Sequence, residues 1–157
     1  MSRRARFGGW LALSFVPALI GLPFPAPAWY RQLAKPRWSP PPAAFGPAWT
    51  LLYTLMGIAA ALVAGRPQAG SRNRALGAFG VQLALNAAWT PIFFGLRRPG
   101  LALAEIVAMW VAVAATTVLF ARQRLAAGLL LLPYLAWVSF ATALNAAIWR
   151  RNRGIGG

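Results

Sequence analysis

One apolar stretch of the chain carries side chains that could bind a flat ligand. Two amides and two aromatic rings recur there at i, i+4, i+7 and i+11, so they share one face of a helix. Amides are costly in hydrocarbon unless they face protein or a cavity, which indicates an inward-facing stripe. Aromatic faces and a few polar groups together are typical of a small-molecule site. The stripe consists of Gln82, Asn86, Trp89 and Phe93.

Two other apolar stretches carry aromatic stripes at helical spacing. Such stripes are more often ordinary core than a ligand site, but several tryptophans and amides converging in one small bundle favour a site. The stripes are Phe45, Trp49, Tyr53 and Met56, and Tyr134, Trp137, Ala141, Leu144 and Asn145.

The sequence contains no Cys, no His and only one acidic residue. It therefore lacks disulfides, thiolates, imidazole bases and the commonest metal and haem ligands. We expect no metal site and no required cofactor, and a function based on shape and stacking. The acid, Glu105, lies inside an apolar stretch and is either a proton or cation site or a side chain reaching Arg97 or Arg98. We favour the second interpretation because no second acid or His could relay protons.

The net charge of +15 would suggest nucleic acid in a soluble protein. Here the basic residues form short clusters between apolar stretches, where anionic lipid headgroups explain them better. We therefore expect membrane lipid as a partner and no nucleic acid. With five spans, each side of the membrane would carry eight positive residues, so the positive-inside rule leaves the orientation open.

Five apolar stretches of about bilayer length dominate the chain, and backbone groups in lipid must pair within their own helix. We expect an all-α fold: a single five-helix membrane domain over residues 1–157. An alternative makes the first stretch a cleaved export signal ending at Ala26-Pro27-Ala28, but Pro27 is awkward in a cleavage site. The predicted helices are 7–24, 43–65, 75–96, 100–121 and 125–149.

Residues 25–42 form a long Pro-rich connection in which aromatic and cationic side chains alternate. Residues 29–33 allow one helical turn, and prolines then prevent its continuation. The segment is either an interfacial anchor or a structured lid over the bundle, and we favour the lid. Its aromatic and charged residues are Trp29, Tyr30, Arg31, Lys35, Arg37 and Trp38.

The third stretch also has a face of small residues, which would let two helices approach closely. Either this face packs within one monomer or it forms the interface of a homodimer, which we favour. Its residues are Gly77, Gly80, Ala84 and Ala88.

The order of these motifs resembles the translocator proteins, also called tryptophan-rich sensory proteins. The most specific motif is W-Y-x(4)-K-P-x-W-x-P-P over residues 29–41, and the aromatic and amide stripes follow in the family's order. The resemblance implies a bundle of five helices, usually dimeric, that binds tetrapyrroles, sterols and synthetic isoquinoline or benzodiazepine ligands. Two departures are Ala146-Ala147, which removes a proposed sterol motif, and Leu101, which replaces a Trp of the animal proteins.

The family's pocket lies beneath the loop between the first two helices. Trp49 and Trp137 match tryptophans that are oxidised when some members degrade protoporphyrin in light, so they are the candidate catalytic residues. Arg31, Lys35 and Arg37 would pair with propionates. The resemblance and the stripes together predict these ligand-binding residues: Tyr30, Trp38, Trp49, Gln82, Asn86, Trp89, Phe93, Tyr134, Trp137, Ala141 and Leu144.

We therefore expect a receptor for porphyrin-type tetrapyrroles and other flat apolar ligands in a bacterial membrane, inner or outer. The rings would stack on tryptophans, while Asn86 and Gln82 contact pyrrole nitrogens. Two alternatives remain: a light-dependent enzyme that degrades protoporphyrin, and a transporter of porphyrins or sterol-like molecules.

Overall fold

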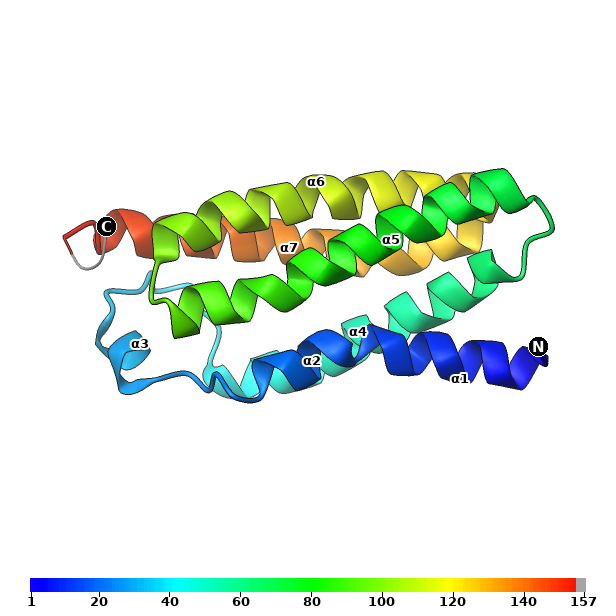
Figure 1. Cartoon of the computed structure of the whole chain (residues 1–157). Coiled ribbons are helices and arrows are strands. Elements are labelled where there is room, and N and C mark those ends of the chain that lie inside the picture. The colour runs from blue at the N-terminus through cyan, green and yellow to red at the C-terminus, as the bar shows by residue number, and fades with distance from the viewer. Residues whose placement is uncertain (155–157) are drawn as a thin grey trace.

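The computed structural model describes residues 1–154, and within them every regular element is helical (Figure 1). The expected all-α class is therefore confirmed. The elements are α1 (Arg3–Ser14), α2 (Val16–Gly21), α3 (Ala28–Gln32), α4 (Pro42–Ala64), α5 (Ala69–Thr90), the π-helical turn η1 (Pro91–Gly95), α6 (Pro99–Gln123) and α7 (Leu125–Arg151).

The helices pack as an elongated bundle, with α5, α6 and α7 on one side and α1, α2 and α4 on the other (Figure 1). Helix α6 packs against α5 and α7, α7 also packs against α4, and α1 and α2 close the ring against α4 and α5. Where α1 packs on α4, a Cβ atom added to Gly57 would lie 2.8 Å from the Cα of Leu11. Large apolar side chains, including Met56, Phe79 and Phe120, fill the centre.

Among residues 1–154, four helices are long and apolar enough to cross a membrane: α4, α5 with η1, α6 and α7. Their bounds lie within a few residues of the predicted stretches, except that α5 begins at Ala69 rather than near residue 75. The earlier start adds polar residues, including Ser71, Arg72 and Asn73, which lie outside the apolar stretch that predicted the span.

The predicted first span, residues 7–24, is divided into α1 and α2 around Phe15. Pro17 causes the break, because it lacks the N–H that would bond to the carbonyl of Leu13 and its ring crowds that carbonyl. The hydroxyl of Ser14 donates to the carbonyl of Trp10 at 2.9 Å, which satisfies one group at the end of α1. This division leaves neither piece long enough to cross a membrane alone.

A second proline changes the end of α5. Pro91 cannot continue the α-helical hydrogen bonds, and the chain widens into a π turn closed by the Leu96 N–H on the Pro91 carbonyl at 2.9 Å. The turn brings Phe93 and Phe94 to residues 25–42, here called the lid after their expected role, where both contact Tyr30. The predicted helical turn in the lid is confirmed as α3.

Candidate functional site

Four polar side chains from α4, α5 and α7 form a continuous chain of hydrogen bonds, here called the amide–tyrosine network. The Tyr53 hydroxyl donates to Oδ1 of Asn86 at 3.0 Å, and Nδ2 of Asn86 donates to the Tyr134 hydroxyl at 2.7 Å. The Tyr134 hydroxyl then donates to Oε1 of Gln82 at 2.8 Å. The remaining amide group, Nε2 of Gln82, lies 3.9 Å from the Met56 sulfur.

This network contains Gln82 and Asn86, the two amides that were predicted to contact a ligand. Gln82 is 1% exposed and Asn86 is 6% exposed, and each amide already has protein partners. Buried amides of this kind are satisfied and hold three helices in register. Their expected contact with pyrrole nitrogens would require these bonds to open.

A second group of aromatic rings, here called the lid cluster, fastens α3 to the end of α5. Phe93 is buried and lies 6.0 Å, centre to centre, from both Trp29 and Tyr30. On its other side it stacks on Trp89 at 4.8 Å. Nε1 of Trp89 donates to Oδ1 of Asn145 at 3.1 Å, which ties the cluster to α7.

Asn152 fixes the lid more directly, and the sequence analysis did not identify it. Its Oδ1 accepts from the Ala34 N–H and its Nδ2 donates to the Ala34 carbonyl, both at 3.0 Å. Both backbone hydrogen-bonding groups of Ala34 are therefore paired with a side chain at the end of α7. An amide just after the last basic residues of a helix was the only available signal, because the partner lies 118 residues away.

The lid cations have different surroundings. Nζ of Lys35 donates to the Tyr30 carbonyl at 2.8 Å and lies 4.6 Å from the centre of the Tyr30 ring. Burial raises the pKa of the Tyr30 hydroxyl above its ordinary value of 10.0. Arg31 and Arg37 are exposed, so two of the three predicted lid charges are free to meet an anion.

The two candidate catalytic tryptophans are neighbours. The rings of Trp49 and Trp137 lie 6.3 Å apart and nearly perpendicular, at 84°. Trp49 stacks on Tyr53 at 5.3 Å, so this pair borders the amide–tyrosine network. Trp137 also contacts Phe45 and Phe140, and Phe140 contacts Trp38 of the lid. A continuous row of rings therefore runs from the network to the lid.

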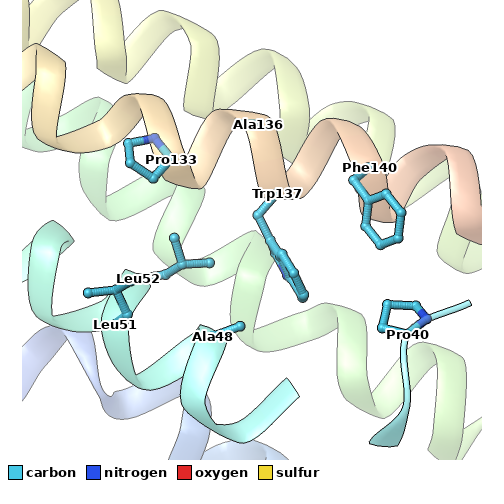
Figure 2. A pocket seen from close by; sticks show the side chains of 8 residues that line it. All are labelled: Pro40, Ala48, Leu51, Leu52, Pro133, Ala136, Trp137 and Phe140. Atoms are coloured by element: carbon cyan, nitrogen blue, oxygen red, sulfur yellow. The ribbon is translucent and has the colours of Figure 1, made fainter. Parts of the chain in front are cut away.

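Beside this row an apolar groove of about 410 Å³ opens between α4 and α7. Figure 2 shows Trp137 projecting from α7 into the space between the two helices, with Pro40 of the lid at one end. We call it the α4–α7 groove. Its lining residues are Pro40, Ala48, Leu51, Leu52, Pro133, Ala136, Trp137 and Phe140.

Only Trp137 among the predicted site residues lines this groove. Trp49 contacts Trp137, and Trp38 contacts the lining residue Phe140. Leu144 is buried in the same apolar cluster as Phe93, and Ala141 packs against the central core. The rest of the lining could not be predicted, because alanine, leucine, phenylalanine and proline carry no signal that separates a groove from ordinary core. Two prolines preceding or interrupting long helices, Pro40 and Pro133, were the available indication.

Glu105 does not make the expected contact with Arg97 or Arg98. Both carboxylate oxygens are buried, and neither has a hydrogen-bonding partner among residues 1–154. Its position on α6 between Ala102 and Ile106, which are both buried, turns the side chain into the bundle.

The predicted dimer face lies on the outside of α5. Gly77, Gly80 and Ala84 are exposed, and Ala88 is half-buried. A Cβ atom added to either glycine would meet no described atom within 4 Å. The alternative that this face packs within the monomer is therefore wrong for the described residues.

Long apolar helices also expose large apolar side chains to the outside, including Val107, Val111 and Leu129. Such a surface is stable in lipid rather than in water. The fold and its outer surface define a multi-pass integral membrane protein.

Comparison with known proteins gives the family. The profile described as the TspO/MBR family matches residues 9–150, and the chain belongs to this family. It is 43% identical to a tryptophan-rich sensory protein of Cereibacter sphaeroides over 94% of this chain and 92% of the relative. It is 46% identical to the human translocator protein over 80% of this chain and 76% of that protein. The family resemblance read from the sequence is confirmed.

Proposed function

We propose that this protein binds flat apolar ligands of the porphyrin class in the α4–α7 groove. The observation that carries the proposal is the groove itself, an apolar space of about 410 Å³ beside a row of aromatic rings. This volume falls within the range of small-molecule sites, ~300–1,000 Å³. The macrocycle would lie against Trp137 and Phe140, and its propionates would reach the exposed Arg37 beside the lid.

The groove favours metal-free porphyrin over haem. None of its lining side chains is a good iron ligand, since they are Pro, Ala, Leu, Trp and Phe. Binding would rest on apolar contact and ring stacking. We therefore expect protoporphyrin IX to bind at least as tightly as haem, and much tighter haem binding would contradict this account.

A dark titration with protoporphyrin IX, followed by porphyrin absorbance, tests the proposal. Trp137→Leu should weaken binding by roughly 2- to 10-fold, because it removes a stacking face worth ~0.5–1.5 kcal/mol. Trp110→Leu is the matched control, since Trp110 is 39% exposed on α6 and does not line the groove. Equal affinities for the two variants would place the ligand elsewhere.

A second candidate is light-driven oxidation of the bound porphyrin, in which O₂ is the oxidant and its oxygen adds to the macrocycle. The contact of Trp137 with Trp49, at 6.3 Å, favours this candidate because the pair could exchange an electron next to the groove. Illumination of the same sample should then give a new absorbing product, and Trp49→Phe should keep binding but reduce product formation. Unchanged product formation would leave binding alone.

Two features of the assembly belong to the same proposal. First, α1 and α2 together act as a fifth span, because residues 3–21 would extend ~28 Å at ~1.5 Å per residue. Opposite accessibility of cysteines placed at the two ends of this segment would test it.

Second, the exposed small-residue face of α5 pairs with a second copy. Gly80→Leu should then shift the mass of the purified protein from dimer to monomer.

A further inference from the structure

Four arginines from three separate segments surround one pocket at the end of the bundle opposite the lid. The pocket has a volume of about 370 Å³. In Figure 1 the N-terminus and the α4–α5 connection lie together at this end, far from α3. The lining residues are Arg3, Arg6, Phe7, Leu62, Gly65, Arg66 and Arg124, and we call this site the arginine pocket.

Arg6 is built into the pocket wall. Its Nε is buried and has no hydrogen-bonding partner among the described residues. Its guanidinium lies against Gly65, where an added Cβ atom would come within 2.9 Å of a terminal nitrogen. The absence of a side chain at Gly65 therefore makes room for Arg6. An unpaired buried N–H is costly, so this geometry calls for an acceptor.

The contacts that the arginines make with neighbouring groups do not neutralise their charge. The guanidiniums of Arg3 and Arg6 lie 5.8 Å and 6.0 Å from the centre of the Phe7 ring. The carbonyl of Arg66 accepts from a guanidinium nitrogen of Arg72 at 3.0 Å, so this contact involves a further cation. None of these contacts supplies a negative charge.

The sequence offers these arginines almost no carboxylate. Its only acidic side chain is Glu105, which lies near the start of α6, whereas Arg124 follows the end of that helix. At ~1.5 Å per residue the two positions are separated by about 28 Å along α6. Four like charges around one pocket repel one another, and an anion with several acceptor oxygens would relieve this repulsion.

We propose that the arginine pocket binds a phosphate-bearing anion, and that its source is the headgroup of an acidic phospholipid. Guanidinium forks match phosphate oxygens in geometry and charge. The pocket lies at the ends of apolar helices, which is the level of lipid headgroups in a bilayer. Leu62 and Phe7 place apolar surface beside the arginines, where acyl chains would begin.

Native mass spectrometry of the purified full chain provides the test, with dioleoylphosphatidylglycerol as the probe and dioleoylphosphatidylcholine as the neutral comparison. Arg6→Gln with Arg124→Gln should weaken phosphatidylglycerol binding roughly tenfold or more. The matched control removes two exposed charges at the lid end, Arg98→Gln with Arg150→Gln, and should change binding less than about threefold. Equal losses in the two double variants would overturn the pocket and leave general surface attraction.

A glycine pair provides a second test that leaves every charge in place. Gly65→Leu puts a side chain where the Arg6 guanidinium lies and should also weaken phosphatidylglycerol binding. Gly70→Leu is its control, because a Cβ atom there meets nothing within 4 Å. Unfolding temperatures identify any variant that fails to fold. Full binding by a folded Gly65→Leu protein would contradict the proposed site.

Excess inorganic phosphate separates the two sources of the anion. If phosphate does not displace phosphatidylglycerol, the lipid headgroup is the ligand, as we propose. If phosphate alone displaces the lipid fully, the free anion is the ligand and the assignment to lipid is wrong. Binding that shows no preference for phosphatidylglycerol over phosphatidylcholine would also overturn it.

Discussion

The amide–tyrosine network and the α4–α7 groove are neighbours, but the network is built from polar side chains and the groove is lined by apolar ones. In the network, Tyr53, Asn86, Tyr134 and Gln82 satisfy one another in the interior. In the groove, every lining side chain is apolar and space remains between α4 and α7 (Figure 2). The row of rings from Trp49 to Trp137 is the boundary between the two regions.

This difference separates stability from binding. Saturated hydrogen bonds in the membrane interior hold helices together, whereas an unfilled apolar surface is available to a guest. We therefore infer that Gln82 and Asn86 mainly hold the helices together, and that ligand affinity depends on ring faces and groove shape. Each region should respond to mutation without the other.

The largest expected effect is on the network. Asn86→Leu removes the partner of both tyrosine hydroxyls and should lower the free energy of unfolding by about 1–3 kcal/mol. Because Asn86 does not line the groove, protoporphyrin affinity of the folded protein should stay within about twofold. Detergent-based thermal unfolding and a dark titration measure the two quantities. A large loss of affinity with little loss of stability would reverse the roles of the two regions.

Removing the lid anchor should have an intermediate effect. Asn152→Ala loses two hydrogen bonds to Ala34, each worth about 0.5 kcal/mol because the site is only part-buried. We expect faster amide hydrogen exchange over residues 33–40, and weaker ligand binding only to the extent that Pro40 leaves the groove. Asn73→Ala, on the exposed start of α5, is the control. Unchanged exchange in the lid would mean that the aromatic rings alone hold it.

The smallest expected effect is the pH dependence of the lid cluster. Because burial raises the pKa of Tyr30 in the folded state, the folded protein keeps the phenol proton at pH values where the unfolded chain loses it. The contribution of Tyr30 is therefore complete below pH 10 and falls as the pH rises through the folded pKa. Unfolding temperatures from pH 8 to 11 should fall more steeply for the wild type than for Tyr30→Phe. Parallel curves would show that Tyr30 is not buried in solution.

Local features of the fold could be predicted from the sequence. Hydropathy and length located α4, α6 and α7 to within a few residues, because lipid requires apolar helices. The break before Pro17 and the π turn at Pro91 follow from missing N–H groups, and both could have been identified from the proline positions.

The site could be predicted only in part. Helical spacing correctly brought Gln82, Asn86 and Tyr134 to the interior, but it could not show that they bind one another rather than a ligand. That depends on how far α5 and α7 are apart, which is a property of packing. The bond between Asn152 and Ala34 joins residues distant in sequence and has no periodic signal.

The most direct test of the central claim is to fill the groove while leaving the network intact. Ala136→Phe puts a ring into the space beside Trp137, whereas Ala115→Phe adds the same ring to an exposed position on α6. In a dark titration with protoporphyrin IX, Ala136→Phe should bind at least about tenfold more weakly than the wild type, a difference of ~1.4 kcal/mol, and Ala115→Phe should bind like the wild type. Wild-type affinity in a folded Ala136→Phe protein would contradict the account, because the porphyrin would then bind outside the α4–α7 groove.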